Sequence, residues 1–289
     1  MTVIENAYAK INLTLDVVAR RADGYHDLVS IMQNISLADT LRFEKTESLE
    51  VVLETHGVLP ADDSNLILRA ARAYFNTVSQ DFGVRIDLQK RIPMQAGLGG
   101  GSADAAATLR ALNVLNHNKL SVDELCEIGA SLGADVPFCI VGGTQICRGI
   151  GERMQPIANR LQGSIVVAMA GEGVSTPKAF GAMDAQFGDF SAQAQQAEQR
   201  LPQIRRALEC GAADEVAPLL YNRFEEVICP IRPAVVHIKD TMRASGAQTA
   251  LMSGSGPSVF GIFAREEDAR AATEALKDSG AMAHMCTLI

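Results

Sequence analysis

The chain has 289 residues, enough for about two domains of ordinary size, each able to bury its own core. It carries 26 Lys and Arg against 34 Asp and Glu, which gives a net charge of −8. An acidic balance lacks the positive field that attracts nucleic acid or an anionic membrane, so we expect neither partner. Apolar residues make up 47% and charged residues 21%, which excludes an intrinsically disordered chain.

The six cysteines form no Cys-x-x-Cys pair and have no histidine at metal-finger spacing, so they predict buried, reduced thiols. No apolar stretch approaches the length that spans a bilayer, and the first ten residues, with an early Glu5, do not resemble a signal peptide. Both observations favour a cytoplasmic protein.

Strand patterns in the first half of the chain occupy five stretches: 8–17, 30–37, 40–44, 49–54 and 84–89. In the first of these, polar residues that include Lys10 and Asn12 alternate with apolar ones, which predicts a half-buried strand with one polar face. Helices are expected after Ser64, which serves as the N-cap, and over 102–113 and 122–132.

The glycine-rich stretch 142–156 is where we expect the chain to leave its first domain, and we place the boundary between domains 1–153 and 154–289. A buried strand over 165–170 and an exposed helix over 191–199 follow. The tail then predicts two strands, a helix and a strand, over 249–252, 259–263, 266–279 and 282–288. That order is the split βαβ pattern of ferredoxin-like domains.

The strongest motif is the glycine-rich run Pro-Met-Gln-Ala-Gly-Leu-Gly-Gly-Gly-Ser-Ala over residues 93–103, which leads into a helix. A helix that starts after such a turn binds anions, because its first N–H groups are unpaired and a phosphate can approach backbone that lacks a Cβ. No lysine follows a glycine in this chain, which excludes a Walker A loop, and Ser102 breaks the dinucleotide-binding fingerprint. We expect a polyphosphate site; the alternative is a flexible loop ahead of a packing helix.

A second motif, Leu-Gly-Ala-Asp-Val-Pro-Phe over 132–138, places Asp135 among apolar and small neighbours. An isolated aspartate in that setting more often caps a turn. However, Lys10 projects from the polar face of the first strand and needs an anion, either Asp135 or a phosphate. The two side chains suit phosphoryl transfer, in which Asp135 would take the acceptor's proton and Lys10 would stabilise developing charge.

Two polar loops complete the motifs: Arg-Ala-Asp-Gly-Tyr-His over 21–26 and Ser-Gly-Ser-Gly-Pro-Ser over 253–258. The second is suited to face an anion, although an ordinary hairpin uses the same residues. In the first, Tyr25 and His26 could stack on and hydrogen-bond a heterocycle, although a Tyr-His pair is more often ordinary surface.

Taken in order, Lys10 with its strand, the 93–107 loop and Met-Ser-Gly-Ser-Gly-Pro-Ser-Val-Phe over 252–260 resemble the GHMP kinases, a family of small-molecule kinases. The resemblance covers nearly the whole chain. It implies a two-domain α+β fold, with a mixed α/β N-terminal domain, a ferredoxin-like C-terminal domain and the active site in the cleft between them. Within the family, the 21–26 and 133–138 motifs are similar to kinases that phosphorylate the 2-hydroxyl of a cytidyl diphosphate ester of methylerythritol, in the non-mevalonate route to isoprenoid precursors.

The resemblance also implies residue roles. Lys10 and Asp135 are catalytic. The substrate is bound by Asn12, Tyr25, His26, Thr176 and Phe180, with the cytosine between Tyr25 and Phe180 and hydrogen-bonded by His26. ATP is bound at Asn65, where the nucleoside lies, and along the glycine loop: Pro93, Met94, Gln95, Ala96, Gly97, Leu98, Gly99, Gly100, Gly101, Ser102 and Ala103.

Two positions depart from the family pattern. Ala103 stands where many relatives have a second serine, which leaves a main-chain contact there, and Arg223 stands where relatives often carry an aspartate. Mg²⁺ is expected with ATP, but the sequence offers no carboxylate set to hold it.

As partners we expect only ATP and a small-molecule substrate, bound by a monomer or weak homodimer. The alternatives are a GHMP kinase that acts on homoserine or mevalonate, and a non-catalytic nucleotide sensor. A sensor needs the phosphate loop but not the proton-transfer pair, so the presence of both Lys10 and Asp135 argues against it.

Overall fold

The computed structural model describes residues 1–289 and divides into two compact units. The first comprises 1–9, 37–94 and 99–142, and the second comprises 10–36, 95–98 and 143–289. The long strands β1 (Thr2–Arg20) and β2 (His26–Thr46) contribute residues to both units. The units therefore alternate along the chain, and the single boundary between residues 153 and 154 stays a prediction.

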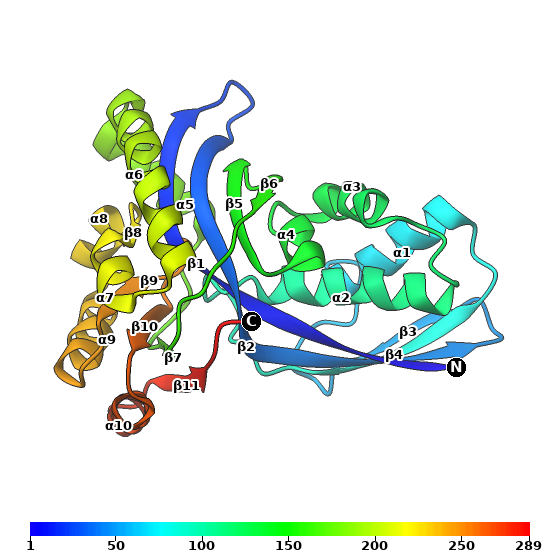
Figure 1. Ribbon diagram of the computed structural model, residues 1–289. Helices are drawn as coiled ribbons and strands as arrows, with labels where there is room; N and C mark the ends of the chain where they lie inside the picture. The colour runs from blue at the N-terminus through cyan, green and yellow to red at the C-terminus, as the bar shows by residue number, and fades with distance from the viewer. The chain divides into compact units, whose positions relative to one another are not determined.

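The first unit is a sheet covered by helices. Its strands run in the order β3-β4-β2-β1, and β2 pairs antiparallel with β4 from Thr40 opposite Gln89 to Thr46 opposite Gly83. Figure 1 shows the helices of this unit gathered on one side of these strands. The elements not yet given are β3 (Val51–Glu54), β4 (Gly83–Gln89), α1 (Leu66–Val78), α2 (Gly100–Leu115), α3 (Val122–Leu132) and α4 (Val136–Val141).

The N-cap of helix α1 lies one residue later than expected, at Asn65 instead of Ser64. The side chain of Asn65 accepts a hydrogen bond from the N–H of Ile67 at 2.9 Å and is the N-cap. Ser64 was predicted to do this, but its hydroxyl and its N–H both bind the carboxylate of Asp62. Helix α3 begins with a capping box between Ser121 and Glu124. The N–H of each residue donates a hydrogen bond to the side chain of the other.

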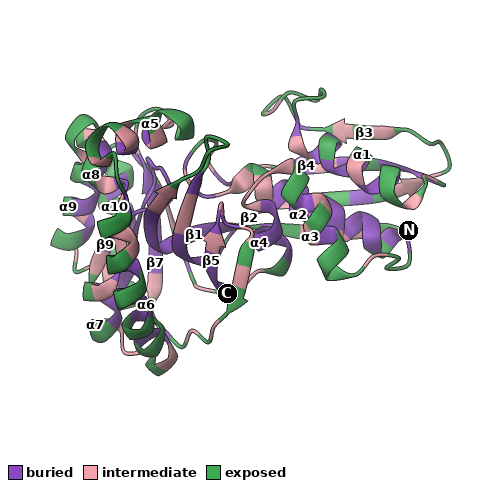
Figure 2. Cartoon of the chain, turned by 90° about the horizontal axis from the view of Figure 1, so that it is seen from above, coloured by how far each residue is buried: buried purple, intermediate pink, exposed green.

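Helix α2 is the buried helix of the first unit. It begins at Gly100, two residues before the predicted start, and most of its side chains are inaccessible to solvent, as the purple ribbon in Figure 2 shows. The run of small residues Ala105, Ala106 and Ala107 lets neighbouring elements approach on several sides. The body of α2 is therefore packed on several sides, whereas Gly101 in its first turn is exposed.

In the second unit, three strands were not predicted. The hairpin of β5 (Thr144–Gly149) and β6 (Arg153–Pro156) extends the sheet from β2, and β8 (Tyr221–Asn222) pairs in parallel with β1. The stretch that holds β5 and β6 was predicted as the place where the chain leaves its first domain, because it contains several glycines.

The ferredoxin-like element is confirmed. Strands β7 (Ser164–Met169), β9 (Thr249–Met252), β10 (Val259–Phe263) and β11 (Met282–Cys286) form an antiparallel sheet in the order β11-β7-β10-β9. Helices α9 (Pro233–Ala244) and α10 (Glu266–Asp278) pack on it. One apolar cluster joins this sheet to these helices and includes Val166, Ile238, Met242 and Leu276.

The remaining helices also belong to the second unit: α5 (Thr176–Phe187), α6 (Ser191–Cys210), α7 (Ala213–Val216), α8 (Glu225–Ile228) and the short 3₁₀ turns η1 (Ala217–Leu219) and η2 (Cys229–Ile231). Helix α6 is longer than predicted. None of the helices combines the length and apolar character needed to cross a membrane. All six cysteines are free thiols, as predicted. Burial was predicted for all of them, but Cys126 and Cys229 are only half-buried and Cys210 is exposed.

Candidate active site

The start of helix α2 has the geometry of an anion site. Gly99 is its N-cap residue, in a left-handed conformation with φ of 69°, and no side chain caps the helix. The first N–H groups of a helix have no partner within it and form the positive end of the helix dipole. The backbone of Gly100, Gly101 and Ser102 therefore offers the kind of site expected from the sequence.

A buried ion cluster lies beside this helix start, and the sequence did not predict it. The ammonium of Lys90 donates to a carboxylate oxygen of Asp39 at 2.5 Å and to one of Asp104 at 2.6 Å, and all three side chains are almost fully buried. Asp39 also accepts hydrogen bonds from the N–H groups of Arg91 and Ile92. A Cβ added to Gly100 would stand 3.2 Å from the Lys90 nitrogen, so the cluster lies directly beside the glycine turn.

The cluster changes the titration of its members. Burial, reinforced by the charge of Asp39 and opposed by Lys90, raises the pKa of Asp104 to about 7. Burial lowers the pKa of Lys90, but the two carboxylates outweigh it, and the net pKa lies above its usual value. Asp104 Oδ1 is buried without a hydrogen-bond partner, as expected for one ammonium shared by two carboxylates.

Ser102 and Asp135 belong to the same unit and lie on neighbouring segments. The Ser102 hydroxyl is 4.0 Å from the place a Cβ on Gly133 would take, and Gly133 is two residues before Asp135. Asp135 is half-buried at the start of α4, and its side chain does not cap that helix. The catalytic role expected for Asp135 stays a prediction, and its alternative, a capping role, receives no support from α4.

In the second unit, the remainder of the glycine motif meets the 253–258 turn. The Ser253 hydroxyl donates to the carbonyl of Gly97 at 3.0 Å, and the N–H of Ser258 donates to the carbonyl of Ala96 at 3.1 Å. Gly97 has φ of 79°, and a Cβ there would stand 2.2 Å from the carbonyl oxygen of Ser253. Glycine is required at 97 by the conformation and by this close approach.

Lys10 lies beside both the glycine motif and the 253–258 turn. Its N–H donates to the carbonyl of Leu98 at 2.9 Å, and its ammonium is 3.5 Å from the place a Cβ on Gly254 would take. The ammonium donates to the side chain of Asn12 at 2.9 Å, and Asn12 in turn donates to Ser30 at 2.8 Å. A buried polar chain thus orients Lys10 toward the 253–258 turn.

Two further side chains fix the 253–258 turn. Asn222, which received no role from the sequence, donates to the carbonyls of Met252 and Gly254 at 2.6 and 2.8 Å. The Thr176 hydroxyl lies 2.9 Å from that of Ser255. Thr176, predicted to line the substrate pocket, is therefore beside the turn that also approaches Lys10.

The predicted base-reading residues are also in the second unit. The rings of His26 and Phe180 are stacked, with centroids 4.6 Å apart and planes 17° from parallel, and Phe224 packs edge-on against Phe180. His26 is buried and bonds Asp184 at 2.7 Å, whereas Tyr25 is 61% exposed on the preceding turn. Asp184 was not predicted, because nothing in its local sequence distinguishes it from a surface residue of α5.

The sequence of this chain is similar to those of known kinases. Two family descriptions match: "GHMP kinases N terminal domain" over residues 65–143 and "GHMP kinases C terminal" over residues 198–281. A protein of Macrococcus caseolyticus called 4-diphosphocytidyl-2-C-methyl-D-erythritol kinase is 40% identical to this chain, across 95% of each. This chain belongs to the GHMP kinase family.

A protein of Moorella thermoacetica with the same name is 42% identical and covers 94% of each chain. The crystal structure of a 4-(cytidine 5'-diphospho)-2C-methyl-D-erythritol kinase matches the fold with a TM-score of 0.82, at 36% identity over 99% of both chains. The two-domain α+β fold of this GHMP kinase is therefore confirmed.

Asn65, the residue expected near the nucleoside of ATP, has a structural task in this GHMP kinase. Its side chain caps α1 and also donates to the carbonyl of Pro60 at 2.7 Å. Within the glycine motif, the side chains of Ala96 and Leu98 are buried, so these two positions present only backbone to a ligand.

Arg223, which departs from the family pattern, has a buried partner. Its guanidinium donates to both carboxylate oxygens of Asp16, at 2.8 and 3.3 Å, and Asp16 is fully buried. Burial raises the pKa of Asp16, and Arg223 partly opposes this. Burial, together with the charge of Asp16, also raises the pKa of the neighbouring Tyr221.

This GHMP kinase contains no group of three or more His, Cys, Asp or Glu side chains placed to hold a metal ion. The side chains present therefore do not form a protein cage for Mg²⁺.

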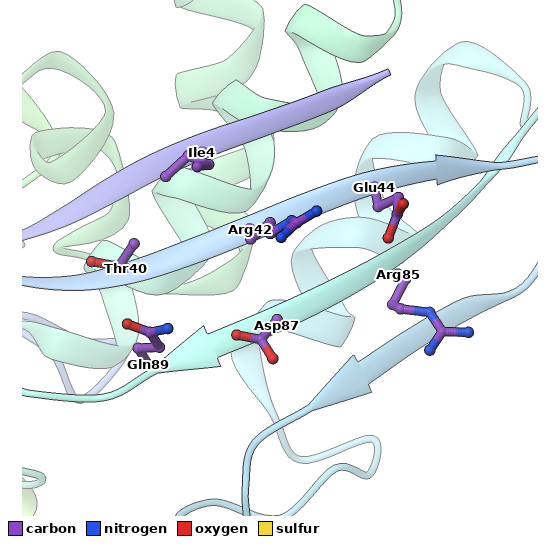
Figure 3. A pocket seen from close by; sticks show the side chains of 7 residues that line it. All are labelled: Ile4, Thr40, Arg42, Glu44, Arg85, Asp87 and Gln89. Carbon is purple, nitrogen blue, oxygen red and sulfur yellow. The ribbon is translucent and has the colours of Figure 1, made fainter.

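A hollow of about 470 Å³ on the first unit is lined by none of the motif residues. Figure 3 shows that its side chains stand on the open face of β1, β2 and β4, and opposite charges face each other across the strands, as in Arg42 beside Asp87 and Glu44 beside Arg85. Ile4 is its one large apolar side chain. These cross-strand pairs keep an uncovered sheet face polar, and no motif places chemistry there.

Proposed function

We propose that this chain transfers the γ-phosphoryl group of ATP to the 2-hydroxyl of 4-diphosphocytidyl-2-C-methyl-D-erythritol, a step of isoprenoid precursor biosynthesis. The observation that carries the proposal is the His26 and Phe180 pair, in a chain that also has a glycine-rich helix start without a side-chain cap. An aromatic face beside a buried imidazole suits a nucleobase. A kinase of homoserine or mevalonate has no base to recognise.

For ATP, we propose that the backbone of 97–102 holds the phosphates, with the Ser102 hydroxyl as an added donor. The remaining positions of the loop, Pro93 to Ala96 and Ala103, complete the binding segment, and Asn65 lies beside the nucleoside. Backbone amides at a helix start bind phosphate without any basic side chain.

In the chemical step, the substrate hydroxyl oxygen forms a bond to the γ-phosphorus while the bond from that phosphorus to the bridging oxygen breaks. The bridging oxygen leaves on ADP with the electron pair, and the hydroxyl proton passes to the carboxylate of Asp135. Lys10 stabilises the charge on the transferring oxygens. Positioning and electrostatic stabilisation are the main contributions of a protein to phosphoryl transfer.

For the second substrate, we propose that the cytosine lies against Phe180 and Tyr25 and is hydrogen-bonded by His26. Asn12 and Thr176 contact the rest of the molecule. Support comes from their surroundings, because Asn12 bonds Lys10 and Thr176 bonds Ser255 of the 253–258 turn.

We further propose that Mg²⁺ arrives with ATP, that the protein works in the cytoplasm, and that it is a monomer or weak homodimer. The nucleotide phosphates would supply most of the oxygen ligands of the ion.

The test is a coupled assay of ADP release from purified protein and ATP with three acceptors in parallel: the cytidyl substrate, homoserine and mevalonate. We expect turnover with the cytidyl substrate and only background with the other two. Turnover of homoserine or mevalonate alone would refute the proposal. ADP release that is independent of every acceptor would indicate a nucleotide-binding protein without this transferase activity.

A further inference from the structure

Asp184 and His26 form a buried pair that the proposed reaction does not yet use. His26 Nε2 lies 2.7 Å from one carboxylate oxygen of Asp184, and the side chains are 5% and 22% exposed. The guanidinium of Arg20 lies 3.4 Å from the other oxygen, so both oxygens of Asp184 are engaged.

The pair sets the hydrogen-bonding character of the imidazole. An ionised carboxylate only accepts hydrogen bonds, so Nε2 carries the proton and donates it to Asp184. The neutral ring then has its lone pair on Nδ1, which is an acceptor. Which nitrogen of a histidine accepts is decided in this way by the partner of the other nitrogen.

The orientation of the ring is fixed as well. Thr176, Phe180 and Asp184 follow one another at intervals of four residues, and therefore lie along one face of α5. Phe180 covers one side of the imidazole, with the two planes 17° apart, while Asp184 holds its edge. A base that is hydrogen-bonded edge to edge with this imidazole lies roughly parallel to the Phe180 ring.

We infer that Asp184 makes this chain select cytosine over uracil, by holding His26 in the tautomer whose Nδ1 accepts a hydrogen bond from the 4-amino group of the base. Cytosine has a donor at position 4, and uracil has a carbonyl acceptor there. With uracil, two acceptors face each other and a hydrogen bond is lost. The inference rests on the proposed function, which assigns His26 to the base.

The first test measures binding by calorimetry with cytidine 5'-diphosphate and uridine 5'-diphosphate. A saturating non-hydrolysable ATP analogue keeps both probes out of the ATP site. We expect the wild-type protein to prefer the cytidine probe, and Asp184→Asn to reduce this preference by roughly tenfold or more, since losing a well-placed hydrogen bond in a recognition site has effects of this order. An asparagine can donate to Nε2 or accept from it, so it no longer selects one tautomer.

The matched control is Asp214→Asn, which removes the same charge from an exposed position on α7 and should leave the preference unchanged. A merely structural role for Asp184 would weaken both probes by the same factor and leave the preference intact, and that result would overturn the inference.

The second test needs no variant and therefore does not depend on the folding of one. Long-range ¹⁵N–¹H correlation spectra of the wild-type imidazoles report which nitrogen of His26 is protonated. A proton on Nδ1, in a neutral ring or in an imidazolium, would overturn the inference, because Nδ1 would then donate. If the protein prefers the cytidine probe but phosphorylates none of the three acceptors, the proposed reaction fails while base selection stands.

Discussion

The buried cluster of Asp39, Lys90 and Asp104 predicts an unusual pH dependence of stability. Asparagine at 104 resembles the protonated aspartic acid and leaves one ammonium beside one carboxylate. Asp104→Asn therefore removes the excess negative charge with little change of shape, and the variant isolates the titration of this one group.

The size and sign follow from the pKa of Asp104, which burial, Asp39 and the opposing Lys90 together set at about 7 in the folded protein. In the unfolded chain it is 3.8. Between these values the folded state holds a proton that the unfolded state has released, so stability falls as pH rises. The loss begins near pH 4, grows by at most about 1.4 kcal/mol per pH unit and levels off above pH 7 at up to about 4 kcal/mol.

The assay is urea unfolding followed by circular dichroism, at intervals from pH 4.5 to pH 8.5, for the wild-type protein and Asp104→Asn. The variant should gain stability relative to the wild type as pH rises, and the difference should stop growing above pH 7. The control is Asp81→Asn, an exposed carboxylate whose ion pair with Lys119 has the atoms 4.0 Å apart. Parallel curves for wild type and Asp104→Asn would refute the reasoning.

Two other predictions concern the glycine turn and the proton acceptor. Gly97→Ala should lower the stability and activity more than Gly24→Ala. Both glycines have positive φ, but only a Cβ at 97 would meet a neighbouring carbonyl oxygen, at 2.2 Å. Equal effects of the two substitutions in denaturant unfolding and ADP-release assays would contradict the close approach. Asp135→Asn should keep ATP affinity in calorimetry but lose on the order of a hundredfold or more in turnover, the scale of a lost general base. Turnover near the wild-type rate would leave Asp135 a structural role.

The fold was predictable where local signals agree with one another. Helix α3 begins and ends as expected because Ser121 and Glu124 form a capping box and the apolar spacing is helical. The ferredoxin-like tail was also predictable, since two strands, a helix and a strand follow one another with clear patterns; in the structure these strands join β7 in the sheet order β11-β7-β10-β9.

Strand β2 was predicted as two strands, over 30–37 and 40–44, and Asp39 lies in the interruption between them. In the structure the strand continues through Asp39, because Lys90 and the N–H groups of Arg91 and Ile92 satisfy the buried carboxylate. Sequence periodicity cannot anticipate a partner that lies 51 residues away in the chain. Asp39, which lies between the two predicted strands, is therefore also a member of the buried cluster with Lys90 and Asp104.

The residues of the candidate site also fall into two groups, those within a local motif and those whose partners are distant in sequence. A resemblance of motifs is enough to propose residues that belong to continuous motifs: Lys10, Asn12, His26, Phe180 and the glycine loop. Asp184 and Asn222 do not, because each acts on a segment distant in sequence: Asp184 on His26, 158 residues away, and Asn222 on the turn that contains Gly254. Side chains that hold others in place are visible only after the chain has folded.

The acidic charge of the chain and the proposed binding of phosphates are compatible because the two act at different scales. The site would bind anions with backbone amides and with Lys10, and the binding strength of these groups depends little on the net charge of −8.

The local charge beside the glycine turn matters more. With both carboxylates ionised, the cluster around Lys90 carries one net negative charge beside the start of α2, where it would repel a phosphate. The raised pKa of Asp104 lessens that charge near neutral pH, and a bound phosphate would raise the pKa further, since like charges favour the protonated form. The buried aspartate can therefore take up a proton as the phosphate arrives, which makes it compatible with an anion site that a permanently ionised pair of carboxylates would oppose.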